Sequence, residues 1–509
     1  MEANANLYSL LAAGFPAERS RVAIETPGRS YTWDDIEATS ARYASLLQSL
    51  DLPAGSRIAV QVEKSPEALM LYLASLRAGL VYLPLNTAYR GAEVEYFLTD
   101  AEPAVVICDS KNFDWVSALA VKAGTAHVYT LDEDGTGSLQ ETAAGHADTF
   151  ETVLSKPSDL AAILYTSGTT GRSKGAMLSH ENLSSNAQVL HEYWGWQADD
   201  VLLHMLPIFH VHGLFVASHG ALLAGAKMIW IPKLDVQRAL EYLPRCTIMM
   251  GVPTYYVRLL ADARFTREVC RNMRLFISGS APLLTETFNE FEARIGQPIL
   301  ERYGMSETIM LTSNPYHAER GKRIGGTVGE PLPGVSVRVV DDQERPLAGP
   351  EVGNVQVRGP NVFSGYWRMP EKTREEFTQD GWFRTGDVGH WGDGTSVPAS
   401  YLSIVGRSKD LIISGGYNVY PKEIETVIDV MPGVAESAVI GVPHSDLGES
   451  VVAVVVAKEG QHLDPAQMLS ELKTQIANFK VPKQIYLVDQ LPRNAMGKVQ
   501  KNTLRQQYS

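Results

Sequence analysis

The segment "LAAILYTSGTTGRSKG" (residues 160–175) joins an apolar run to a loop rich in Gly, Ser and Thr. The apolar run predicts a buried strand, and the loop is expected to leave from its end. Glycines let backbone N–H groups turn toward an anion, and hydroxyl groups and Lys174 add donors and charge, so the loop suits a polyphosphate. The spacing Gly168-x-x-Gly171-x-x-Lys174 does not fit the G-x-x-x-x-G-K-[ST] pattern of P-loop NTPases. A flexible surface loop of turn-forming residues stays open as the alternative.

On both sides of this loop, strand-like runs alternate with helical patterns such as "SPEALMLYLASLRAG" (65–79). The strand-like runs include "RIAVQV" (57–62), "AVVICD" (104–109), "AAILYT" (161–166) and "RLFISG" (274–279). This alternation predicts a layered α/β architecture with largely buried sheets.

The residue composition and the apolar spacing of the chain change twice toward its end. Short β-like pieces rich in Gly and Trp, from about Gly353 to Tyr401, predict a small β subdomain. Beyond it, a helix is predicted from Pro421 through Met431, because the apolar residues recur at helical spacing. A second helix is predicted after the N-cap Asp464, with Ile476 on its apolar face, and "SVVAVVVAK" (450–458) predicts a buried strand between them.

We therefore predict two domains in an α/β protein. Residues 1–408 would form a large N-terminal domain with two layered α/β sheets and the small β subdomain. Residues 409–509 would form a small, mobile α+β domain. A chain of 509 residues is long for a single core, which favours this division.

Composition excludes several classes of protein. The 509 residues are 45% hydrophobic and 20% charged, as in ordinary globular proteins, and the net charge of -13 opposes binding to nucleic acid or anionic lipid. No long apolar run predicts a membrane span, and the first residues show no basic region of a signal peptide. Cys108, Cys246 and Cys270 lie far apart without a CxxC pair, which fits a reducing compartment. We predict a cytoplasmic protein without membrane or nucleic-acid partners.

Six segments resemble, in order, the signatures of the adenylate-forming superfamily, which contains acyl-CoA synthetases, adenylation domains of nonribosomal peptide synthetases and beetle luciferases. The segments are "YTSGTTGRSKGAMLSHENL" (165–183), "SGSAPL" (278–283), "ERYGMSET" (301–308), "FRTGD" (383–387), "GRSKDLIISGGYNVYP" (406–421) and "LPRNAMGKVQKN" (491–502). Within that superfamily the chain resembles the malonyl-CoA synthetases most, through "RAGLVYLPLNTAYR" (77–90), "LPIFHVHGLFVAS" (206–218), "LFISGSAPLL" (275–284), "GPNVFSGYWRMPEKT" (359–373) and "NVYPKEIE" (418–425).

The resemblance implies a reaction in two steps. A small dicarboxylate and ATP, with Mg²⁺, would give an acyl-adenylate and pyrophosphate, and coenzyme A would then give the thioester and AMP. Lys498 would be the catalytic lysine of the first step, and Glu307 the catalytic carboxylate associated with Mg²⁺. Without the resemblance, Lys498 is an exposed lysine and Glu307 a solvated carboxylate at a helix start.

The resemblance also places the nucleotide. The residues of the β,γ-phosphate loop would be Thr166, Ser167, Gly168, Thr169, Thr170, Gly171 and Lys174. The adenine pocket would be formed by Gly279, Ser280, Ala281, Glu301, Arg302 and Tyr303, with Thr308 or Ser306 near the α-phosphate. Asp387 would accept hydrogen bonds from the ribose hydroxyls, and Arg407 would be a second nucleotide contact. Tyr303 in a core and Asp387 as a turn cap are the alternatives.

The acyl and coenzyme A sites rest on fewer residues. His210 resembles a gate at the acyl pocket, whereas His212 is expected to be a core histidine. A buried distal carboxylate needs a cation, and we assign that role to Arg258, with Ser278 or Ser280 as an added donor. Met310 would border the substrate, and Val211 stands where the malonate-activating pattern often has Thr. An Arg258 side chain that reaches from a helix face to water is the alternative.

Gly415 and Gly416 would pass the pantetheine arm of coenzyme A, and Lys409 would be the hinge of the C-terminal domain. Two other functions stay open: a carboxylate-CoA ligase for another short, aryl or fatty acid, and a stand-alone adenylation enzyme that serves a carrier protein. Malonate and methylmalonate both stay open as the substrate.

Overall fold

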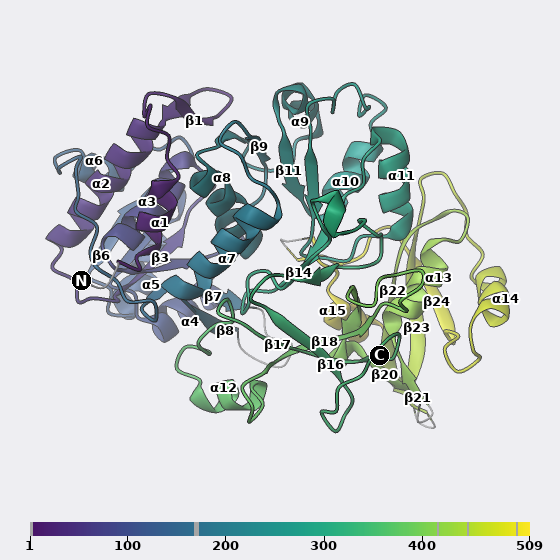
Figure 1. Ribbon diagram of the computed structural model, residues 1–509. Coiled ribbons are helices and arrows are strands. Elements are labelled where there is room, and N and C mark those ends of the chain that lie inside the picture. The colour runs from purple at the N-terminus through teal and green to yellow at the C-terminus, as the bar shows by residue number, and fades with distance from the viewer. Residues whose placement is uncertain (1–3, 167–172, 415–416, 445–446, 495–496) are drawn as a thin grey trace.

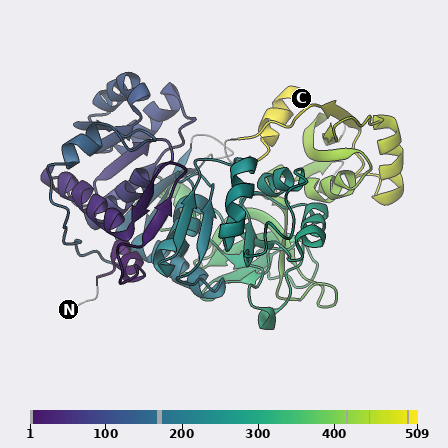
Figure 2. The ribbon, with the colours of Figure 1, turned by 90° about the horizontal axis from the view of Figure 1, so that it is seen from above.

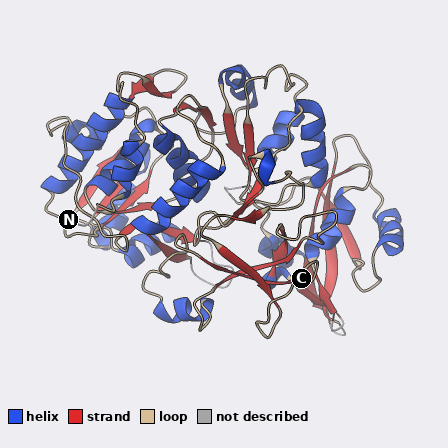
Figure 3. Cartoon of the chain, viewed as in Figure 1, coloured by secondary structure: helices blue, strands red, loops and turns tan. Residues whose placement is uncertain are grey.

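The computed structural model describes residues 4–166, 173–414, 417–444, 447–494 and 497–509. The strands of this part of the chain form four sheets, three of them before residue 408 and one after it (Figures 1 and 3). The predicted class, a large α/β region with a β subdomain followed by a small α+β region, is confirmed.

The first large sheet has the strand order β6-β5-β3-β4-β7-β8, parallel except for the last pair. Its strands are β3 (Arg57–Gln61), β4 (Val81–Pro84), β5 (Val105–Cys108), β6 (His127–Thr130), β7 (Leu160–Thr166) and β8 (Lys174–Ser179). β7 is the strand predicted before the glycine-rich loop, and residues 167–172 of that loop lie outside the described residues.

The second large sheet has the order β15-β14-β13-β12-β11-β9-β10-β1-β2, and β1, β10, β9, β11, β12 and β13 run parallel. Its strands are β1 (Val22–Glu25), β2 (Ser30–Thr32), β9 (Val201–His204), β10 (Lys227–Trp230), β11 (Ile248–Gly251), β12 (Leu275–Ser278), β13 (Leu300–Tyr303), β14 (Thr312–Ser313) and β15 (Glu330–Pro331). The carboxyl ends of its parallel strands meet at one edge, which is where ligands bind in such sheets.

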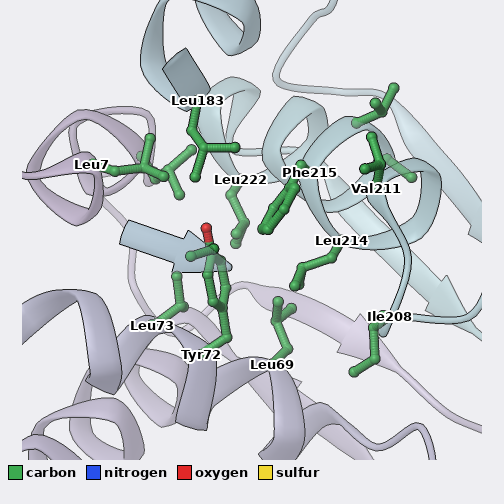
Figure 4. Close-up of a cluster of buried hydrophobic side chains, with 14 of the residues drawn as sticks. Leu7, Leu69, Tyr72, Leu73, Leu183, Ile208, Val211, Leu214, Phe215 and Leu222 are labelled. Carbon is green, nitrogen blue, oxygen red and sulfur yellow. The ribbon is translucent and has the colours of Figure 1, made fainter. Parts of the chain in front are cut away.

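Helices cover these two sheets and share a core between them. Figure 4 shows part of this core, in which Leu69 and Tyr72 of α3 (Pro66–Arg77) point toward Leu214 and Phe215 of η2 (His212–Ser218). Ser65 caps the helix predicted at 65–79, because its side chain accepts from the backbone of Ala68. The helices are α1 (Leu7–Ala13), α2 (Trp33–Ser49), α3 (Pro66–Arg77), α4 (Gly91–Ala101), α5 (Phe113–Lys122), α6 (Ser138–Ala143), α7 (His180–Tyr193), α8 (His219–Ala224), α9 (Val236–Tyr242), α10 (Pro253–Leu260) and α11 (Thr285–Ile295), with the short turns η1 (Ser110–Asn112), η3 (Leu243–Arg245) and η4 (Ala318–Arg320) and the π-helix η2 (His212–Ser218).

The predicted β subdomain is an antiparallel sheet of four strands. Its strands are β16 (Ser336–Val340), β17 (Gly353–Arg358), β18 (Phe383–Trp391) and β19 (Leu402–Arg407), with helix α12 (Pro370–Glu376) between β17 and β18. The short turn η5 (Ser408–Asp410) follows β19 and contains Lys409.

The C-terminal region has its own sheet and its own apolar core, at the opposite end of the molecule from α2 in Figures 1 and 2. The sheet contains β20 (Ile412–Ser414), β21 (Tyr417–Val419), β22 (Val434–His444), β23 (Gly448–Ala457) and β24 (Gln484–Val488), and the helices are α13 (Pro421–Asp429), α14 (Pro465–Gln475) and α15 (Lys501–Tyr508). The strand predicted at 450–458 is β23, so that prediction is confirmed.

Both predicted C-terminal helices exist but are shorter than expected. α13 ends at Asp429, so Met431 lies outside it, and α14 ends at Gln475 because Ile476 is extended. The apolar side chains of Met431 and Ile476 still pack on the C-terminal core. Apolar spacing therefore marked the residues that face the core rather than the end of the helix.

No helix in the described part of the chain is both long enough and apolar enough to cross a membrane. Cys108, Cys246 and Cys270 are buried free thiols.

Candidate active site

Strands from two sheets meet around the carboxylate of Asp387. Asp387 lies on β18 opposite Arg407 of β19, and Arg407 Nε lies 3.1 Å from Asp387 Oδ1. From β13 of the other sheet, the Tyr303 hydroxyl donates to Asp387 Oδ2 at 2.5 Å. The Asp387 charge raises the pKa of Arg407, and burial, with help from Asp387, raises that of Tyr303. Asp387 is thus a buried strand residue and not a turn cap, and its carboxylate is held in one orientation.

The segment after β13 turns sharply and brings Glu307 beside Phe363, whose backbone N–H donates to the Glu307 carbonyl at 2.8 Å. A Cβ on Gly304 would lie 1.9 Å from the Ile309 carbonyl oxygen, so this position requires glycine. Ile309 has a φ of 56°, a strained value for a β-branched residue. Asn361 fixes the turn, because its side-chain amide donates to the carbonyls of Thr308 and Met310 at 2.7 and 3.0 Å. Glu307 lies in this turn and not at a helix start.

Tyr366 connects Glu307 to the lysine that follows the glycine-rich loop. Its hydroxyl donates to Glu307 Oε1 at 2.9 Å, and Lys174 Nζ lies 4.4 Å from the centre of its ring. Burial raises the pKa of Glu307, an effect that the Tyr366 hydrogen bond opposes. Lys174 also contacts Glu376 of α12 at 3.4 Å. Tyr366 lies inside "GPNVFSGYWRMPEKT" but was not predicted as a site residue, because nothing in the spacing indicates its partners.

Lys498 enters the site from the C-terminal region. A tight turn holds its backbone, in which Asn494 and Lys498 pair and Gly497 has a φ of 75°. The Lys498 side chain keeps solvent access, yet desolvation by the surrounding protein and then the Arg407 charge lower its pKa. Asp387 and Glu307 lie close enough to oppose that shift. Residues from three distant segments therefore act on one lysine.

Lys409 lies in η5, two residues beyond Arg407. Desolvation, followed by the charge of Arg407, lowers the pKa of Lys409 to about 8. The next residue, Asp410, accepts a hydrogen bond from Arg505 of α15 at 2.8 Å. The junction between the two regions is thus charged and partly buried.

The histidine segment forms another side of the site. Burial, then Arg302 and Lys498, lower the pKa of His210 to about 4, so this ring is neutral at pH 7. His212 Nδ1 lies 3.3 Å from Ser280 Oγ, whereas its Nε2 is buried without a partner in the described part of the chain. The prediction of His212 as a core histidine is confirmed for its burial, but one of its nitrogens is unpaired.

The remaining predicted residues occupy varied environments. Thr166 ends β7, and its hydroxyl donates to the Lys174 carbonyl at 3.4 Å. Ala281 is half-buried, and Met310 and Val211 are buried in the shared core. Glu301 is buried and accepts from the Gly326 backbone at 3.2 Å, and burial raises its pKa to about 8.

Besides His212, further buried residues of this region have polar atoms without partners among the described residues. The atoms are Ser278 Oγ, Thr308 Oγ1, Asn361 Oδ1, and Nε and Nη2 of Arg302. Buried polar groups are normally paired, so such atoms indicate a place where a ligand supplies the missing partner.

Arg258 is exposed on α10, which is the alternative geometry considered for it. Ser167, Gly168, Thr169, Thr170 and Gly171 of the phosphate loop, and Gly415 and Gly416 of the coenzyme A segment, lie outside the described residues.

Comparisons with known proteins agree with this arrangement. The family model "AMP-binding enzyme" matches residues 12–367, and "AMP-binding enzyme C-terminal domain" matches residues 423–498. The malonate-CoA ligase of Arabidopsis thaliana is 33% identical, over 95% of this chain and 86% of that protein.

Two solved structures of one protein, with and without ATP, differ in how closely they match the arrangement of this chain. The crystal structure of ATP-bound MatB from Rhodopseudomonas palustris is 54% identical, covers 99% of both chains and superposes with a TM-score of 0.95. The apo form of MatB has the same identity and coverage but a TM-score of 0.85. Because the sequences compared are equally similar, the difference lies in the arrangement of the chain, which here is closer to the ATP-bound form.

Proposed function

The chain belongs to the AMP-binding enzyme family, and from that premise we propose that it is an ATP-dependent malonate-CoA ligase. The malonate carboxylate attacks the α-phosphorus of ATP to give malonyl-adenylate and pyrophosphate. The coenzyme A thiol then attacks the acyl carbon, and malonyl-CoA and AMP leave. The similarity to malonate-CoA ligase and to MatB supports the substrate.

The observation that carries the chemistry is the convergence of Lys498 with His210, Asp387 and Glu307. The first step brings a carboxylate to a polyphosphate, so positive charge must be held where the two anions meet. The Lys498 ammonium supplies that charge. Asp387, oriented by Tyr303 and Arg407, accepts hydrogen bonds from the ribose, and Tyr303 stacks on the adenine. Fixed contacts at the ribose hold the α-phosphate in line for attack.

Mg²⁺ fits the residues beside Glu307. No group of three or more His, Cys, Asp and Glu side chains that could hold a metal occurs among the described residues. Mg²⁺ often binds through one or two carboxylates and the phosphates of a substrate. Glu307 would hold the ion, which would neutralise phosphate charge, and the unpaired Thr308 hydroxyl would donate to a phosphate oxygen.

The second step needs a different arrangement of the C-terminal region. We assign residues 409–509 to a mobile domain that turns at Lys409 and exchanges Lys498 for the segment with Gly415 and Gly416, which would contact the pantetheine arm. The two TM-scores with MatB support a change of arrangement that is linked to nucleotide. We also place the enzyme in the cytoplasm, which the three free thiols support.

Pyrophosphate release tests the proposal. The purified protein is given ATP, Mg²⁺ and coenzyme A with malonate, methylmalonate, succinate, acetate, benzoate or octanoate, and thioester formation is followed in parallel. The highest kcat/KM is expected with malonate or methylmalonate. A maximum with a monocarboxylate would contradict the substrate but not the family. Pyrophosphate release without any coenzyme A thioester would instead favour an adenylation enzyme that serves a carrier protein.

A further inference from the structure

Lys174, the first residue of β8, is held between an aromatic ring and a carboxylate. Its Nζ lies 4.4 Å from the centre of the Tyr366 ring and 3.4 Å from Glu376 Oε1 of α12. Only 18% of the Lys174 side chain and 23% of the Glu376 side chain are exposed. A partly buried pair is screened less by salt than a pair at the surface. The Lys174 ammonium therefore has an anionic partner that the protein itself supplies.

Glu376 ends α12, where the helix itself does not favour a carboxylate. The carboxyl end of a helix carries partial negative charge, and a Lys four residues before a Glu is the less favourable order for an ion pair. Lys372 nevertheless lies 3.1 Å from Glu376 Oε1. The Thr373 hydroxyl accepts from the Tyr366 backbone N–H at 2.9 Å, which ties α12 to the residue that packs on Lys174. The contact with Lys174 thus accounts for the position of Glu376 better than helix stability does.

The sequence resemblance gives Lys174 a second anionic partner, the β,γ-phosphates of ATP. A carboxylate repels a polyphosphate at close range, whereas an ammonium attracts it. An ammonium that is already paired with a carboxylate must give up that contact before it can pair fully with a phosphate oxygen. Glu376 and the phosphates are therefore alternative partners of one cation. Lys372 is the cation that can stay with Glu376 after the exchange.

We propose that Glu376 is a positioning residue that competes with the β,γ-phosphates for Lys174, and that it thereby weakens the binding of ATP and pyrophosphate and promotes pyrophosphate release; this rests on the ATP-dependent function proposed above. When the phosphates bind, Lys174 Nζ exchanges Glu376 for a phosphate oxygen. When pyrophosphate leaves, Glu376 pairs with the ammonium again and returns Lys174 to the face of Tyr366. The exchange changes ion-pair partners and no covalent bond.

Calorimetry with pyrophosphate and Mg²⁺ on the purified protein tests the proposal. In Glu376→Gln the Kd of pyrophosphate is expected to fall about fivefold, which is the effect of removing one competing, partly exposed ion pair. The inhibition constant of pyrophosphate as a product should fall by the same factor. A merely structural role of Glu376 predicts the opposite, because a distorted site binds its ligand more weakly.

Glu375→Gln is the matched control, because Glu375 also contacts Lys372, at 2.9 Å, but is 66% exposed and forms no ion pair with Lys174 in the described part of the chain. Its Kd should stay within about 1.5-fold of wild type. A second comparison adds Glu376→Gln to Lys174→Met, where the Kd should not fall, since the shared cation is gone.

Unchanged or weaker pyrophosphate binding in Glu376→Gln would overturn the role of Glu376. The same fall in Kd in the Lys174→Met background would overturn it too, because the effect would not pass through Lys174. If the wild-type protein binds neither ATP nor pyrophosphate in the presence of Mg²⁺, the proposed function fails and not the assignment of Glu376 alone.

Discussion

Two buried basic side chains beside the second large sheet differ in how many hydrogen-bond partners they have. Lys64 has all its contacts filled, because Nζ donates to the carbonyls of His204 and Ile231 at 2.8 Å and lies 3.0 Å from His204 Nδ1. The ring of Trp230 covers it at 4.4 Å. Arg302, by contrast, has two nitrogens without a partner among the described residues.

Lys64 uses its donors for contacts within the fold, whereas Arg302 has donors that a ligand could use. Lys64 precedes α3 and contacts the ends of β9 and β10, so it joins the two large sheets. A cation whose donors are all used adds nothing new to a ligand. A cation with unused donors in a buried place lowers stability until a ligand arrives. Changes at the two kinds of residue should therefore affect different measurements.

The largest expected effect extends the functional side of this comparison. Lys498→Ala should lower adenylation about 10³-fold, since a charge at the reacting anions is lost. Conversion of supplied malonyl-adenylate to the thioester should continue, and the melting temperature should not change. Rapid-quench assays of both steps measure this, with the exposed Lys483→Ala as the control in the same domain. Equal loss of both steps would place Lys498 with the structural residues.

The next effect is on stability. Lys64→Met should lower the free energy of unfolding by about 3 kcal/mol, because two buried carbonyls and His204 Nδ1 lose their partner. Arg302→Met should change it by less than about 1 kcal/mol, or raise it, since an unpaired charge is replaced by an apolar chain. Urea titrations followed by tryptophan fluorescence compare the two variants. A larger loss of unfolding free energy in Arg302→Met than in Lys64→Met would contradict this difference between the two residues.

A smaller effect concerns the junction between the domains. Lys409→Pro should reduce thioester formation about 10-fold more than adenylation, because proline fixes φ at the residue assigned as the hinge. Single-turnover measurements of each step give the ratio. Lys409→Ala keeps the backbone free and should leave the ratio near that of wild type. The hinge assignment is wrong if proline and alanine give the same ratio.

The smallest effect tests the pairing of Glu307. Tyr366→Phe removes a hydrogen bond that lowers the pKa of Glu307, so this pKa should rise further. Since the ionised carboxylate is the active form, activity is lost as the pH falls through that pKa, and the acid limb of the pH profile should shift to higher pH. We expect pyrophosphate release to fall about threefold at pH 7, consistent with the loss of one hydrogen bond. A limb that moves to lower pH would contradict the role of Tyr366.

The sequence predicted much of this molecule because local patterns carry the information. The strands at 57–62, 161–166 and 450–458 and the helix at 65–79 follow from apolar spacing and caps. The ends of the C-terminal helices did not, because Met431 and Ile476 face the core from outside a helix.

The site was predicted less evenly. Asp387, Arg407 and Glu307 lie together as the resemblance implied, because each belongs to a motif with its own spacing. Tyr366 and Asn361 were missed, since their roles arise from contacts across the fold that no spacing encodes. The environments of Arg258 and Arg302 were also beyond the sequence, because composition does not show which of two arginines is buried without a partner.

The hairpin of β18 and β19 carries both the Asp387–Arg407 pair and, two residues later, Lys409. A nucleotide that touches this pair would therefore bind next to the hinge proposed for the C-terminal region. By thermodynamic linkage, a nucleotide that prefers one orientation of that domain shifts its population by the ratio of its two affinities, and the orientation in turn sets how tightly AMP is retained. Under the proposed rotation, the release of AMP and the orientation of the C-terminal region are thermodynamically coupled.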